Sequence, residues 1–200
     1  MTIHYFESHL TVKITEENTI GQFKEACKSI DAKPIIINLG NGNIPQQVMT
    51  SSTYRNTLNN VYETVKQDVL KLEELGFEVI RTKIEVDSSY TGKSLYSEIH
   101  IPCHSRKLVE YPHLLDNIKL QTMDGRTVRG YISRNEFKPN VTFITWRSKF
   151  IEDFNYFHSV HGGLLELGVL LNPLDKIELE IAVYDSNEGL DNTWIHGEIV

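Results

Sequence analysis

The sequence contains little cysteine, and its two cysteines are far apart. Cys27 and Cys103 form no C-x-x-C pair and match no zinc-binding spacing. A chain of 200 residues can bury enough apolar surface to fold without a disulfide. We therefore expect two reduced, partly buried thiols, in a protein whose fold depends on neither a disulfide nor structural zinc.

Long hydrophobic runs are also lacking. No apolar stretch approaches the roughly 18 residues that a membrane-spanning helix needs. The segment 1–7 has no basic region followed by an apolar one, which a secretory signal would show. The sequence therefore predicts a cytoplasmic protein without a membrane partner.

Positive charge is in deficit, with 20 Lys and Arg against 27 Asp and Glu and a net charge of -7. Bulk nucleic-acid binding needs many cationic contacts to phosphates, so this balance argues against it. A local basic pocket for a small anion remains compatible with the balance. We expect the partner to be a small anionic, nucleotide-like ligand.

Period-two alternation is the clearest pattern present. In residues 5–14, Phe6, Leu10 and Val12 alternate with polar side chains, which predicts a strand with one core face and one polar face. The same reasoning, with helical spacing elsewhere, predicts strands at 5–14, 35–39, 46–53, 77–86, 96–103, 129–133, 141–149 and 176–184, and helices at 16–30, 56–75, 108–120 and 150–168.

This element order occurs twice. Each half has the order β-α-β-β-α-β, and Glu7-Ser8-His9 at the start of one aligns with Glu98-Ile99-His100 at the start of the other. The order predicts an α+β fold of two ferredoxin-like lobes, related by a pseudo-twofold axis, whose antiparallel sheets face a central cleft. We expect one domain, 1–200, with lobes at 1–90 and 91–200.

The polar strand faces carry the candidate chemistry. Residues two apart share a face, so Glu7, His9 and Thr11 point the same way, as do Glu98 and His100. Two imidazoles on opposite walls of a cleft can serve as general base and general acid in phosphodiester cleavage. The Thr11 hydroxyl can bond a phosphate oxygen, and the two glutamates can orient the rings.

These strands resemble those of the 2H phosphoesterases, the LigT-like superfamily, in which each lobe carries His-x-Thr/Ser-hydrophobic. His9-Leu10-Thr11-Val12 fits that motif, and His100-Ile101-Pro102-Cys103 fits it in the histidine alone. The resemblance implies a phosphodiesterase for cyclic or 2′-5′-linked nucleotides that needs no metal or cofactor. It assigns catalysis to His9, His100 and Thr11. Pro102 leaves open whether the chain is an enzyme at all.

Three cations on neighbouring strands are candidate substrate-binding residues, together with Glu7 and Glu98. Arg81, Lys83 and Arg147 could hold an anionic group. The alternative is ion pairing between the halves, because Glu178 and Glu180 align with Arg81 and Lys83.

Two other functions stay open. Alternating charges on the strands also resemble the CYTH-class triphosphate tunnel enzymes, which would need a divalent metal; Glu7-x-His9-x-Thr11-x-Lys13 lacks the middle glutamate of their opening motif. Alternatively, the chain is a non-catalytic domain that sequesters a ligand or binds a protein. His158 and His161 lie three residues apart and could share a helix face, but no third metal ligand is evident nearby.

Overall fold

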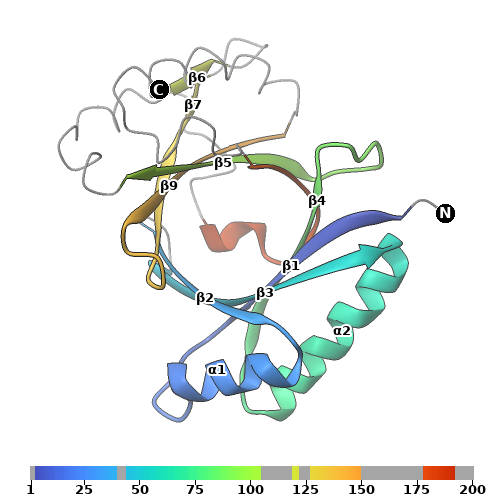
Figure 1. The fold of residues 1–200 in the computed structure, drawn as a ribbon, viewed down its shortest axis with the longest axis vertical. Helices are drawn as coiled ribbons and strands as arrows, with labels where there is room; N and C mark the ends of the chain where they lie inside the picture. Colours follow the sequence, from blue (N-terminus) through green and yellow to red (C-terminus); the bar gives the residue numbers. More distant parts are fainter. Residues whose placement is uncertain (1–2, 40–43, 105–118, 122–126, 150–177, 192–200) are drawn as a thin grey trace.

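Eight antiparallel strands form one closed barrel (Figure 1). The structure is a computed structural model that describes residues 3–39, 44–104, 119–121, 127–149 and 178–191. The barrel strands are β1 (His4–Val12), β2 (Lys33–Leu39), β3 (Gln46–Asn56), β4 (Val79–Asp87), β5 (Tyr96–His104), β8 (Tyr131–Asn135), β9 (Val141–Ser148) and β10 (Glu178–Asp185). Strands β6 (Lys119–Gln121) and β7 (Thr127–Arg129) pair separately as a two-stranded sheet.

Closure of the barrel corrects the predicted fold. The order around the barrel is β1-β3-β2-β8-β9-β5-β10-β4, with β4 returning to β1. The prediction of two ferredoxin-like lobes facing each other across a cleft is wrong, because β4 pairs with β10 and β2 pairs with β8. These pairings satisfy the backbone groups that an open sheet leaves exposed at its edges. A single enclosed lumen takes the place of the cleft.

The two stretches of chain contribute contiguous parts of this barrel. Residues 4–87 supply the strands in the order β4-β1-β3-β2, and residues 96–185 supply β10-β5-β9-β8 in the corresponding order. The two Glu-x-His strands, β1 and β5, therefore have equivalent neighbours and are separated by β4 and β10. Both strands therefore belong to the wall of one lumen, whereas the prediction placed them on two separate sheets across a cleft. The lobe boundaries themselves stay a prediction.

Helices α1 (Ile20–Ser29) and α2 (Leu58–Glu74) lie outside the barrel, against the part formed by residues 4–87 (Figure 1). α1 begins at Thr19, whose side chain accepts from the Gln22 amide while the Gln22 side chain accepts from the Thr19 amide. Phe23 of α1 and Val65 of α2 pack with outward-facing strand residues in the main hydrophobic core. That core lies between helices and barrel, so the lumen is left for other side chains.

The other predicted helices are largely outside the described residues. Of the predicted helix at 108–120, residues 105–118 are not described, and 119–121 form β6. The predicted helix at 150–168 and the His158–His161 pair fall wholly outside. Cys27 and Cys103 are both free and buried, and burial raises the pKa of each thiol to about 12. In the part of the chain that is described, no helix is long and apolar enough to cross a membrane; a cytoplasmic location stays a prediction.

Candidate metal and ligand site in the barrel lumen

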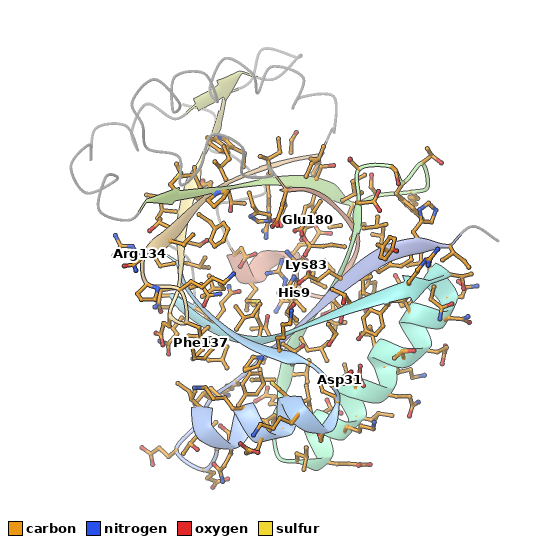
Figure 2. The ribbon with its side chains drawn as sticks, in the orientation of Figure 1. His9, Asp31, Lys83, Arg134, Phe137 and Glu180 are labelled. Carbon is orange, nitrogen blue, oxygen red and sulfur yellow. The ribbon has the colours of Figure 1, made fainter. Side chains whose placement is uncertain are left out.

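The barrel encloses a cavity of about 530 Å³ that is lined by the inward-facing side chains. Strand alternation produces this lining: on β1, Phe6 and Leu10 face the outer core while Glu7, His9 and Thr11 face inward. The lumen has two unlike walls. Ionisable residues line it along β1, β4, β10 and β5, and Figure 2 shows His9, Lys83 and Glu180 directed toward its centre. The facing wall carries apolar side chains from β2, β3 and β9, namely Ile35, Ile37, Leu39, Met49 and Phe143.

His9 is the centre of the first group of ionisable residues. Its Nε2 lies 3.2 Å from Glu85 Oε2 and 3.6 Å from Glu7 Oε1. Its Nδ1 lies 3.0 Å from the Thr50 carbonyl, which can only accept, so Nδ1 donates. Burial disfavours the imidazolium, but the hydrogen bond and charge of Glu85 outweigh it and raise the pKa of His9. We call Glu7, His9 and Glu85 the first Glu-x-His unit.

His100 has an equivalent environment. Its Nε2 lies 3.2 Å from Glu180 Oε2 and 3.4 Å from Glu98 Oε2, while its Nδ1 lies 2.7 Å from Thr145 Oγ1. Burial opposes protonation here too, and Glu180 outweighs it to raise the pKa of His100. We call Glu98, His100 and Glu180 the second Glu-x-His unit. In each unit the first glutamate faces the second across a strand pair, Glu7 opposite Glu85 and Glu98 opposite Glu180.

Lys83 connects the two units. Its Nζ lies 2.7 Å from Glu85 Oε1 and 3.0 Å from Glu98 Oε2. Burial disfavours the charge on each side chain, yet mutual attraction raises the pKa of Lys83 and holds the pKa of Glu85 well below its ordinary value. Arg147 forms a further ion pair with Glu98. The predicted pairing of Lys83 with the glutamates of β10 is therefore wrong, because β4 and β5 supply its partners.

A buried ion-pair network closes one end of the lumen. The short helix η2 (Glu188–Asp191) places Asp191 Oδ2 2.6 Å from Arg81 Nη1 and 2.8 Å from Arg147 Nη1, and Gln47 donates to its other oxygen at 2.6 Å. Arg81 also binds Asp185 at 2.6 Å. Burial opposes ionisation of both aspartates, but the arginines hold the pKa of each below its ordinary value. We call these residues the floor network.

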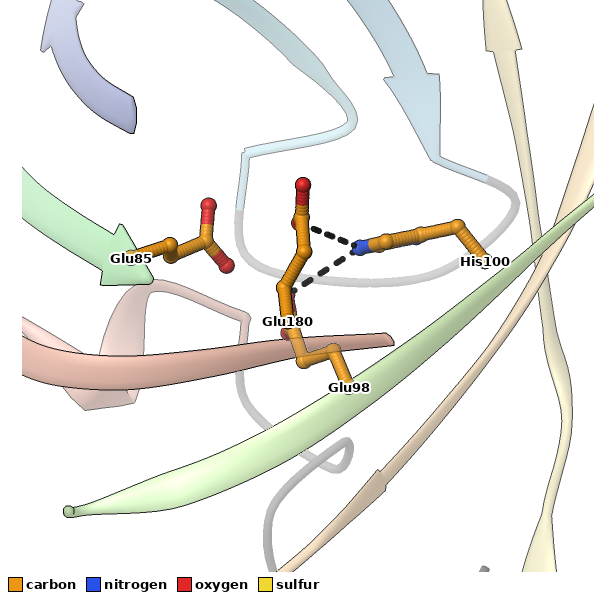
Figure 3. A group of neighbouring side chains, drawn as sticks. All are labelled: Glu85, Glu98, His100 and Glu180. Atoms are coloured by element: carbon orange, nitrogen blue, oxygen red, sulfur yellow. Dashed lines mark ion pairs between the residues drawn. The ribbon is translucent and has the colours of Figure 1, made fainter. Parts of the chain in front are cut away.

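Four side chains near the middle of the lumen could hold a metal ion. Glu85, Glu98, His100 and Glu180 each offer one ligand atom, and these atoms all lie within 4.8 Å of one another (Figure 3). They project from β4, β5 and β10, which are adjacent strands. Glu85 is 1% exposed and Glu98 is fully buried. Among the described residues, no group donates a well-aligned hydrogen bond to either Glu85 oxygen, although Lys83 and His9 lie within ion-pair range.

Part of this site was predictable from the sequence. All eight predicted site residues line the cavity: Glu7, His9, Thr11, Arg81, Lys83, Glu98, His100 and Arg147. Arg81 belongs to the floor network, and Thr11 lies beside it in strand register. Glu85 had no predicted role, and Glu180 was considered as an ion-pair partner and as part of the resemblance to the tunnel enzymes. The alternation Arg81-x-Lys83-x-Glu85 was the available signal, since it places Glu85 on the same face as two predicted residues.

No protein-family model and no curated protein matches the sequence. Three solved structures share part of its arrangement at low identity. One, provisionally named a chlorite dismutase, has 12% identity and a TM-score of 0.32, covering 90% of this chain and 95% of its own. A provisionally named monooxygenase from Fusobacterium nucleatum has 10% identity and a TM-score of 0.38, covering 94% and 95%. A dye-decolorizing protein from V. cholerae has 6% identity and a TM-score of 0.29, covering 90% and 93%.

The barrel corrects the predicted family and function. The described strands close into one barrel and leave no cleft between two sheets, on which the predicted chemistry depended. The resemblance to 2H phosphoesterases, and with it the predicted phosphodiesterase or nucleotide-binding activity, is wrong. Neither the triphosphate tunnel alternative nor the non-catalytic sequestering or protein-interaction domain gains support from the comparisons. At these TM-scores the likenesses carry no inference about what this protein does.

Proposed function

We propose that the barrel lumen is a divalent metal centre, held by Glu85, Glu98, His100 and Glu180. The observation that carries this proposal is the convergence of three carboxylates and one imidazole, from three adjacent strands, with ligand atoms within 4.8 Å of one another. Side chains on strands of a closed barrel are held in place by their neighbours on both sides, so such a group is preorganised for an ion.

Electrostatics support a cation at this point. Three carboxylates this close repel one another, and burying them is costly unless a cation is near. Lys83 lies between Glu85 and Glu98, and Arg147 also pairs with Glu98. Among the described residues, Glu180 pairs with His100, whose charge depends on protonation. The buried Glu85 carboxylate forms ion pairs only with Lys83 and His9 among the described residues, and each of its oxygens keeps a lone pair for an ion. A divalent ion could take the place of the proton on His100 and bind all three carboxylates at once.

The imidazole is also oriented for coordination. When Nδ1 of His100 donates its hydrogen to Thr145 Oγ1, the Nε2 lone pair is directed toward the glutamates. A hydrogen bond at one ring nitrogen commonly fixes the tautomer and orientation of a metal-binding histidine in this way. The 2H resemblance implied no metal, because it assigned the two histidines to catalysis.

The ligand types favour Mn²⁺ or Fe²⁺. Carboxylates suit Mg²⁺, Ca²⁺ and Mn²⁺, and an imidazole shifts the preference toward first-row transition metals. Four protein ligands would leave two positions open on a six-coordinate ion. The site is therefore suited to bind a further molecule at the metal.

Titration of Mn²⁺ into the full chain, followed by isothermal calorimetry and by electron paramagnetic resonance of free Mn²⁺, tests the proposal. We expect one ion per chain. Glu180→Gln should weaken binding by about tenfold or more, because partners of metal ligands alone contribute that much. Glu178→Gln is the matched control, since Glu178 lies two residues away on β10 and lines the same cavity outside the ligand group. Equal Mn²⁺ affinity in the two variants, or no binding by the unaltered protein, would overturn the proposal.

A further inference from the structure

We infer that the lumen holds, beside the metal, a small organic anion whose acidic group binds the ion and whose apolar body packs on the wall of β2, β3 and β9. This inference rests on the proposed metal centre. The cavity volume and the lining side chains that the metal would not use fit this class of molecule.

The apolar wall has no role in holding an ion. In β2 both faces are apolar: Ile36 points outward into the core against the helices, while Ile35, Ile37 and Leu39 line the lumen. Ile35 and Ile37 are only partly buried, so apolar surface inside the cavity stays open to water. Covering such surface with an apolar group is favourable. Met49, on the flanking strand β3, and Phe143, on β9 beyond β8, extend the same wall.

The volume agrees with a small molecule. The cavity of about 530 Å³ falls within the range of small-molecule pockets, about 300–1,000 Å³, which combine mostly apolar lining with a few placed polar groups. An ion with two coordinated waters would occupy a small part of it. The charged wall and the apolar wall together line one space, so a ligand with one acidic end and one apolar end matches both.

The charges that line the cavity require the metal ion to bind before the organic anion. Without a metal, Glu7, Glu85, Glu98 and Glu180 along one wall repel an anion. With a divalent ion in place, the local sign changes and the open coordination positions face the lumen. Lys33 and Lys138 also line the cavity, are exposed, and form no ion pair with any residue that the structure describes, so they attract an incoming anion. Anion binding should therefore depend on the metal.

The experiment compares benzoate, acetate and inorganic phosphate as probes, by calorimetry on the full chain with saturating Mn²⁺ and again with EDTA. We expect benzoate to bind the Mn²⁺ form at least about tenfold more tightly than acetate, since only benzoate carries an apolar body. We expect no measurable benzoate binding in EDTA. Equal affinity for benzoate and acetate, tighter binding of phosphate, or benzoate binding unchanged by EDTA would each overturn the inference.

Two variants separate this inference from the metal centre. Ile37→Thr keeps a β-branched residue on β2 but places a hydroxyl in the apolar wall, so it should weaken benzoate binding by about fivefold while Mn²⁺ affinity stays unchanged. Asn38→Thr is the control, because the Asn38 side chain bonds Glu136 and Gln46 outside the lumen. If Mn²⁺ binds normally but benzoate binding does not depend on the metal, the organic-anion inference is refuted and the metal centre stands. Failure to bind Mn²⁺ at all refutes the metal centre first.

Discussion

The two Glu-x-His units have the same geometry but unlike surroundings. In each, a histidine Nε2 lies 3.2 Å from a glutamate on the neighbouring strand. Directly across the strand pair, however, His9 faces Lys83, whereas His100 faces Glu178. The first unit therefore has a cation, Lys83, on one of its own two strands. In the second unit, the charge of Glu98 is balanced by Lys83 and Arg147, which come from other strands. Three of the four candidate metal ligands, Glu98, His100 and Glu180, belong to this second unit.

The largest expected effect comes from removing the cation that distinguishes the two units. Lys83→Met should lower the free energy of unfolding of the metal-free protein by about 3–5 kcal/mol, because it leaves Glu85 and Glu98 buried without their shared partner. The same change removes repulsion toward a metal ion. Mn²⁺ should therefore stabilise the variant more than the unaltered protein, as measured by urea unfolding with and without Mn²⁺.

Removing the exposed ion pair at Lys13 provides a control for charge alone. Lys13→Met deletes a cation directly after β1, where Lys13 pairs with the exposed Glu78 at 3.5 Å. Stability should change little, as for most exposed ion pairs. If Mn²⁺ stabilised Lys83→Met no more than it stabilises Lys13→Met, the assigned role of Lys83 would be wrong.

An intermediate effect is expected from the floor network, which joins the two parts of the barrel. Asp191→Asn removes the charge that Arg81 and Arg147 share, and should cost about 1–3 kcal/mol of stability near neutral pH. The pKa values of Asp185 and Asp191 are lowered in the folded state. Their contribution is therefore complete above the unfolded pKa of about 3.9 and is lost as pH falls below it toward the folded values.

Unfolding measured between neutral pH and about pH 2 tests this assignment. The unaltered protein should lose stability over the acidic part of this range, and Asp191→Asn should lose less there, since one of the two titrating carboxyls is gone. Parallel pH dependence of the two proteins would contradict the assignment.

The smallest expected effect concerns the hydrogen bonds that orient the two histidines. His100 depends on a side chain, Thr145, whereas His9 depends on the backbone carbonyl of residue 50. Thr145→Val keeps the shape but loses the hydroxyl, and should weaken Mn²⁺ binding by about tenfold with little change in stability. Ser51→Ala, which removes a 2.6 Å hydrogen bond to Glu7 in the first unit, should leave Mn²⁺ affinity unchanged. Equal effects of the two changes would show that the metal does not belong to the second unit.

Much of the local structure was predictable from residue patterns. The strand expected at 5–14 is β1 (His4–Val12), and the helix expected at 56–75 is α2 (Leu58–Glu74), because strong period-two and helical apolar spacing dominate those segments. The same alternation placed His9, Lys83 and His100 on faces away from the helices. The partners of these residues were not predictable: Asp191, from η2, contacts Arg81 across 110 residues of sequence.

The amino-acid sequence by itself determined which side chains avoid the hydrophobic core, because alternation along a strand assigns each residue to one of two faces. It also determined that Glu-x-His occurs on two such strands. Only the tertiary structure decided that these faces enclose a lumen, since closure depends on β4 pairing with β10 and β2 pairing with β8. Pairing register between distant strands then brought Glu85, Glu98, His100 and Glu180 together, and no local pattern encodes that register.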